Sequence, residues 1–113
     1  MHRFKQLKAW QKTMKLAIDV YSATNKFPES EKYGLVTQMN RAVVSIASNI
    51  AEGSGRNSPR EFDQFLGYAL GSAYELETQL LIASDLSMIR DELVDKILSS
   101  LAEVQKLIIG LKK

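Results

Sequence analysis

The chain has 113 residues, of which 45% are hydrophobic and 25% are charged, and its formal net charge is +2 at pH 7. This is the size and composition of one globular domain, and it excludes a disordered chain. Cysteine is absent, which excludes disulfides, thiolate nucleophiles and cysteine-ligated metal sites. No apolar run approaches the roughly 18–20 residues of a membrane span, so we expect a cytoplasmic protein.

The first predicted helix covers residues 5–24. Its apolar residues recur at helical spacing: Leu7, Trp10, Met14, Ala17, Ile18 and Tyr21. The helix should end before Pro28, because the residue preceding a proline avoids the helical region. Four lysines at spacings of three, four and three are expected to form a stripe on the opposite side: Lys5, Lys8, Lys12 and Lys15.

This lysine stripe concentrates the positive charge at the N-terminus. Residues 1–15 hold five basic and no acidic side chains, whereas the other 98 residues hold ten basic and thirteen acidic ones. Such a row could follow phosphates, with strong salt dependence. The alternative is an ordinary solvated helix face. An oligomer would multiply the row, and avidity would then favour the first interpretation.

The second predicted helix covers residues 31–52, with Ser30 as its N-cap and Gly53 as its C-cap. From Gly34 to Ala51 its only charged residue is Arg41. A surface helix normally carries charged residues opposite its apolar stripe. We therefore expect another copy of the chain to cover a second face of this helix. The alternative is that other helices of the same chain cover it.

The third predicted helix covers residues 59–84 and begins at a capping box, with Ser58 at the N-cap and Glu61 at N3. Away from its core face lie four residues that suggest close packing of another backbone: Gly67, Gly71, Tyr74 and Thr78. Backbone amides at a helix N-terminus favour anions. Arg56 and Arg60 are therefore candidate phosphate contacts, although a turn with a cap explains this segment as well.

The fourth predicted helix covers residues 91–111, with an apolar stripe from Leu93 to Leu111. All three connections are short, so that sequential helices should be antiparallel neighbours. The sequence therefore predicts an all-α fold, an antiparallel up-and-down four-helix bundle that forms a single domain over residues 1–113.

Several polar residues are predicted to lie inside this bundle. Arg41, Ser45, Asn49 and Glu52 form one stripe on the second helix, and Glu77 falls among the core residues of the third. A buried carboxylate needs a partner, and Arg41 could supply a guanidinium fork. We interpret the five residues as a structural polar network. An active site built from Glu52, Glu75 and Glu77 is the less favoured alternative.

Histidine usage argues against catalysis and metal binding. The only histidine, His2, lies far from these glutamates in the sequence. Di-iron bundles need Glu-x-x-His pairs, and histidine-dependent nucleophilic sites lack their base. We expect no enzymatic activity, no metal and no cofactor.

Several stretches of the chain resemble a known family. They include residues 4–10 (FKQLKAW), 27–35 (FPESEKYGL), 49–53 (NIAEG), 62–66 (FDQFL) and 75–78 (ELET), together with Gln38, Arg41, Ser45 and Gly71-Ser72. These residues closely resemble bacterial four-helix-bundle proteins encoded in intervening sequences of 23S ribosomal RNA genes. Ser87-Met88-Ile89 departs from the family's Gly/Tyr-containing turn.

The resemblance implies a ring-like homo-oligomer, notably a homopentamer, with no established enzymatic activity. A similar bundle is the accessory protein of diversity-generating retroelements, where a basic pentamer works with a reverse transcriptase and nucleic acid. We therefore predict RNA binding through Lys5, Lys8, Lys12, Lys15, Arg56 and Arg60, and loss of binding on Lys8→Glu/Lys12→Glu. The alternative is a scaffold that binds a protein partner and no nucleic acid.

Overall fold

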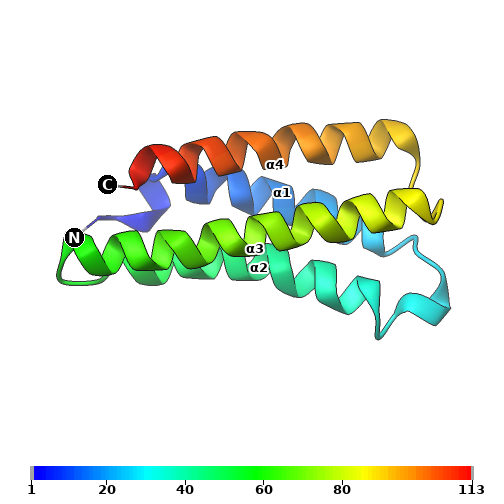
Figure 1. The fold of residues 1–113 in the computed structure, drawn as a ribbon, viewed down its shortest axis with the longest axis horizontal. Coiled ribbons are helices and arrows are strands. Elements are labelled where there is room, and N and C mark those ends of the chain that lie inside the picture. Colours follow the sequence, from blue (N-terminus) through cyan, green and yellow to red (C-terminus); the bar gives the residue numbers. More distant parts are fainter. Residues whose placement is uncertain (1, 113) are drawn as a thin grey trace.

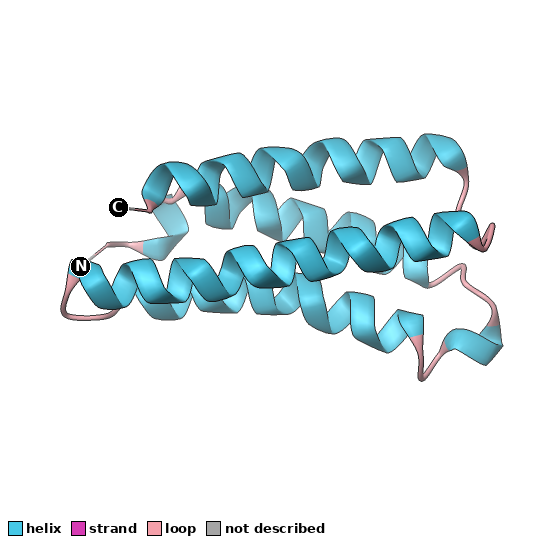
Figure 2. Ribbon diagram, viewed as in Figure 1, coloured by secondary structure: helices cyan, strands magenta, loops and turns pink. Residues whose placement is uncertain are grey.

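The structure is a computed structural model that describes residues 2–112. These residues form four antiparallel α-helices: α1 (Lys8–Thr24), α2 (Leu35–Ser54), α3 (Pro59–Asp85) and α4 (Asp91–Leu111) (Figure 1). Two short 3-10 helices, η1 (Phe4–Gln6) and η2 (Glu29–Glu31), precede α1 and α2, and no strand occurs within this range (Figure 2). The predicted all-α up-and-down bundle is confirmed.

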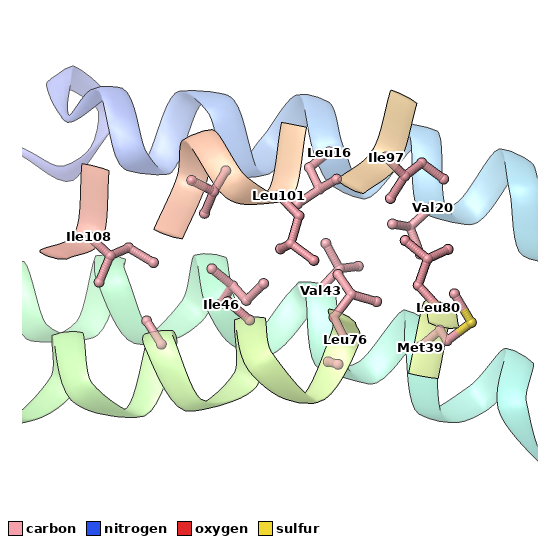
Figure 3. Close-up of a cluster of buried hydrophobic side chains, with 14 of the residues drawn as sticks. Leu16, Val20, Met39, Val43, Ile46, Leu76, Leu80, Ile97, Leu101 and Ile108 are labelled. Atoms are coloured by element: carbon pink, nitrogen blue, oxygen red, sulfur yellow. The ribbon is translucent and has the colours of Figure 1, made fainter. Parts of the chain in front are cut away.

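The helices are arranged as a square in which each packs against its neighbours in the chain and α1 packs against α4. One core fills the centre, and all four helices contribute to it, for example Leu16, Met39, Leu76 and Leu101 (Figure 3). Burying a side chain of this kind is worth about 1.5–3 kcal/mol. Burial of these apolar stripes explains why four amphipathic segments form one unit.

The apolar stripe expected on the first helix was only partly right, because Leu7, Trp10 and Ala17 are partly buried and pack against the core. The residues of α1 that enter the core are Ala9, Thr13, Leu16, Val20, Ala23 and Thr24. Of the six residues proposed, Ile18 is 68% exposed, Tyr21 is 47% exposed and Met14 is 43% exposed. The helix is apolar on two sides, so periodicity alone did not identify the side that faces the bundle.

Two helices begin later than the sequence suggested. Leu7 is extended, with ψ at 124°, so α1 starts at Lys8 rather than at residue 5. This break lets the Phe4 ring pack edge to face on Trp10, with their centroids 5.2 Å apart. Gly34 likewise leaves the helical region, and α2 starts at Leu35 rather than at residue 31.

The predicted caps were right at one helix and wrong at the other. The N–H of Glu61 donates to Ser58 Oγ at 3.2 Å, so Ser58 caps α3 as expected. Ser30 does not cap α2. The Glu31 carboxylate instead accepts from the Leu35 N–H at 3.2 Å and satisfies one amide of the first turn. Gly53 also lies within α2 rather than at its C-cap.

The turn after α3 contains a residue in the left-handed region. Ser87 has a φ of 59°. The N–H groups of Met88 and Ser87 donate to the carbonyls of Ala83 and Ser84, which is the hydrogen-bonding pattern of a Schellman motif. Serine therefore occupies a position that usually favours glycine.

Candidate nucleic-acid interface

Three of the four predicted lysines share one side of α1. Lys8 and Lys15 are exposed, and Lys12 lies between them beside α4. Lys5 does not continue this row, because it belongs to η1 and is separated from α1 by the extended Leu7. The lysine face of α1 therefore consists of Lys8, Lys12 and Lys15.

One lysine of this face is already paired within the protomer. Lys12 Nζ lies 3.7 Å from Glu103 Oε1 on α4. Both side chains are about half exposed, so this ion pair contributes little to stability. It nevertheless offsets the charge of Lys12. Lys8 and Lys15 form no ion pair within residues 2–112, which makes them the stronger candidates for phosphate contacts.

The two candidate arginines differ in the same way. Arg56 Nη2 donates to Glu52 Oε2 at 2.6 Å, and its guanidinium lies 4.5 Å from the centroid of the Phe65 ring. Arg56 is thus held against the α2–α3 connection. Arg60 is exposed in the first turn of α3 and has no ion pair in the described part of the chain.

Folding brings the separated basic segments to one end of the bundle. The start of the chain, the α2–α3 connection and the end of α4 all meet there (Figure 1), and the His2 N–H donates to the Ser54 carbonyl at 3.0 Å. We call this the terminal end and define it as residues 2–8, 52–63 and 106–112. The far end comprises residues 24–35 and 82–92.

The two ends differ in charge. The terminal end holds seven basic residues and three acidic ones, with the basic residues being Arg3, Lys5, Lys8, Arg56, Arg60, Lys106 and Lys112. The far end holds three basic and five acidic residues. The formal charges are therefore +4 and −2, at opposite ends of a molecule 43 Å long.

A cavity of about 470 Å³ opens at the terminal end and is lined by His2, Arg56, Phe62 and Lys112, among others. The Arg56 and Lys112 side chains that line this cavity both have ion-pair partners. Arg56 pairs with Glu52, and Lys112 Nζ lies 3.3 Å from Asp63 Oδ1. The amide of Glu61, in the first turn of α3, is bonded to Ser58. The capped turn expected from the sequence is therefore confirmed, whereas phosphate contact by Arg56 and Arg60 stays a prediction.

The predicted polar network is divided into separate parts. Ser45 Oγ lies 2.9 Å from Ser72 Oγ, and Asn49 Nδ2 donates to the Ser45 carbonyl at 2.8 Å. Glu52 pairs with Arg56 rather than with the other network residues. Arg41 is exposed and has no ion pair among residues 2–112. The expected single network was therefore wrong.

The placement of Glu77 in the core was wrong as well. Glu77 is half-buried at the edge facing α4, where its Oε1 accepts from Gln105 Nε2 at 2.8 Å. The core positions of this part of α3 are Ala73, Leu76 and Leu80. Glu77 is one residue beyond Leu76, and the resulting rotation of about 100° moves it from the core to the edge.

The chemistry of the glutamates gives no support to the alternative active site. Glu52 and Glu75 are exposed, and Glu77 contacts an amide. Within residues 2–112, no three His, Asp or Glu side chains gather closely enough to hold a metal ion.

None of the helices described is both long and apolar enough to cross a bilayer.

The uncharged surface of α2 is only partly covered within the chain. Between α1 and α2 lies an apolar hollow of about 310 Å³, the α1/α2 groove, lined by Trp10, Met14, Ala17, Val44, Ala47, Ser48 and Ala51. Val44 is 45% exposed, and Ser48 is exposed too. Sequence reasoning did not single out this groove, because Trp10, Met14 and Ala17 had been grouped with the other apolar residues of α1 in one stripe.

Comparison with known proteins places the chain in a family. Residues 5–110 match the family model described as 23S rRNA-intervening sequence protein. The chain belongs to this family. A crystal structure of a protein of unknown function from the S23 ribosomal protein family of Bacteroides thetaiotaomicron is similar to it, with a TM-score of 0.83 and 26% identity. The similarity covers 93% of this chain and 98% of that one. No functionally curated protein matches the intervening-sequence protein.

Proposed function

We propose that this intervening-sequence protein assembles with copies of itself and binds RNA without catalysing a reaction. The observation that carries the proposal is the separation of charge along the bundle. Lys5 and Lys8 from the start of the chain and Arg60 from the first turn of α3 reach one basic end and are exposed without ion pairs in the described residues.

The expected mode of binding is contact with phosphates. Lysine and arginine side chains at the protein surface neutralise phosphates and release counterions, with little base specificity. Lys15 extends the surface along α1, while Lys12 and Arg56 could join by exchanging Glu103 and Glu52 for phosphate. Self-association, which we expect to give a homopentamer, would present several such ends to one RNA and raise its apparent affinity.

Salt dependence tests this function directly. Binding of a fluorescent structured RNA is measured by anisotropy between 50 and 200 mM salt, with the mass of the assembly determined by light scattering in parallel. Four phosphate contacts in the complex would weaken binding by roughly 50- to 150-fold over this range, and each further protomer that contacts the same RNA would steepen the loss. An affinity that stays unchanged would contradict contact through phosphates.

A scaffold that binds a protein partner is the second candidate. The observation that favours it is the low charge of the exposed surface of α2, where Arg41 is the only charged residue between Leu35 and Ala51. Absence of RNA binding at low salt, with self-association retained, would support the scaffold and exclude RNA binding. A stable monomer at micromolar concentration would contradict the assembly itself.

A further inference from the structure

The protomer has a second surface that is poor in charge, on the outside of α3. Between Gln64 and Ile82 the exposed positions of this helix carry one charged side chain, Glu75. Tyr68, Tyr74, Leu81 and Ile82 are each about half exposed. We call this surface the α3 outer face. A solvated helix face of this length normally carries several charges.

No helix of the same chain covers the α3 outer face. Within residues 2–112, α3 packs against α2 and α4 but not against α1, its diagonal neighbour. A Cβ added to Gly71 would meet no atom within 4 Å, so packing inside the protomer does not explain this glycine. The α3 outer face is therefore not covered by the part of the chain that the structure describes.

The α1/α2 groove and the α3 outer face lie on different sides of the bundle. The groove is formed by α1 and α2, whereas the face belongs to the helix diagonal to α1. A contact that pairs one face of the first copy with a different face of the next copy is heterologous. Such contacts close into rings when the rotation between copies allows it. Two unlike apolar faces on one chain are what this arrangement requires.

We propose that the α3 outer face of one copy packs into the α1/α2 groove of the next. This inference rests on the self-association included in the proposed function, and it specifies which surfaces meet. The groove is hollow and apolar, and the absence of a side chain at Gly71 leaves room for a close approach to α3. Tyr74 is exposed on the following turn and supplies an aromatic side chain to fill the groove.

Charge complementarity favours a second copy as the occupant. The only charged residue on the central exposed surface of α2 is Arg41, and the only one on the α3 outer face is Glu75. They have opposite signs, and neither forms an ion pair within the part of the chain that the structure describes. Contact between copies would bring Glu75 of one to the side of the groove where Arg41 of the other lies.

One variant on each surface tests the proposal. Ser48→Glu places a charge in the groove, and Gly71→Glu places one on the α3 outer face. Both positions are exposed in the protomer, and glutamate favours a helix more than glycine does, so neither change should unfold the chain. Ala102→Glu, at an exposed position of α4, is the matched control. Circular dichroism verifies the fold of all three.

We expect light scattering to give the protomer mass for Ser48→Glu and for Gly71→Glu, and the wild-type assembly mass for Ala102→Glu. Ser48→Glu keeps an intact α3 outer face, and Gly71→Glu keeps an intact α1/α2 groove. An equimolar mixture at about 100 μM should therefore form a 1:1 dimer with one intact contact and no larger species.

The outcomes separate this inference from the proposed function. Wild-type assembly in either blocked variant, or a mixture that stays monomeric, would overturn the pairing of these surfaces while leaving self-association in place. A wild-type chain that is itself monomeric would refute the assembly on which both depend.

Discussion

Gly53 in α2 lies directly against Phe65 in α3, and a Cβ built on Gly53 would fall 2.5 Å from the Cβ of Phe65. The clashing atom is the Cβ of Phe65, whose position the backbone of α3 determines, rather than the mobile end of a flexible side chain. Any larger residue at this position would therefore push the two helices apart at the terminal end. The glycine is needed for close packing, not for a left-handed conformation.

We expect Gly53→Ala to destabilise the protein by about 1–3 kcal/mol. The better helix propensity of alanine, worth about 1 kcal/mol, offsets only part of the clash. Urea unfolding at a fixed protein concentration measures the change. Gly110→Ala is the control, because a Cβ there meets nothing within 4 Å, and it should be neutral or slightly stabilising. Equal stability of the two variants would show that α2 and α3 separate without cost.

Ser87→Gly should stabilise the turn between α3 and α4. Ser87 has a φ of 59°, a conformation that costs an L-residue about 1–2 kcal/mol and glycine almost nothing. The greater freedom of glycine in the unfolded chain removes part of this gain, so we expect about 0.5–1 kcal/mol. Thermal unfolding provides the measurement. Ser99→Gly, inside α4, should lose about 0.5 kcal/mol instead, and a loss at both sites would argue against the left-handed turn.

Glu77→Ala should lower the free energy of unfolding far less than the removal of one partner of a buried ion pair would. Glu77 is half-buried and bonded to Gln105, so we expect a loss of about 0.5–1.5 kcal/mol. A double-mutant cycle with Gln105→Ala isolates the coupling between the two side chains. A loss above about 3 kcal/mol would instead restore the interpretation of Glu77 as a buried carboxylate.

Reversing the charge of two unpaired lysines should weaken RNA binding without unfolding the chain. Lys8 and Lys15 are exposed on the lysine face of α1, and Lys8→Glu/Lys15→Glu should lower the affinity by about tenfold or more, because phosphate contacts are lost and repulsion is added. Anisotropy with the same structured RNA measures the effect. This pair isolates the basic surface better than Lys8 with Lys12, since Lys12→Glu would also face Glu103.

The matched control reverses two lysines at the opposite end of the molecule. Lys26 and Lys32 are exposed in the far end, and Lys26→Glu/Lys32→Glu makes the same change in net charge. We expect this control to bind within about threefold of the wild type once salt screens distant charges. Equal losses in the two double variants would mean that net charge, rather than a basic surface, decides the affinity.

The sequence by itself determined the number, order and type of the helices. Prolines, glycines and caps act on the residues next to them, and periodicity is a property of each helix alone. The capping residue Ser58 was predictable for this reason. The exposed, nearly uncharged surface of α2 was predictable too, because only Arg41 interrupts it between Leu35 and Ala51.

Only the tertiary structure decided how each helix is rotated and which side chains meet. Packing turned α1 so that Leu16 and Val20, rather than Ile18 and Tyr21, enter the core. It placed Lys12 beside Glu103 and Glu77 beside Gln105. These pairs join residues far apart in the chain, and the axial rotation that selects them depends on all four helices at once. No local pattern contains that information.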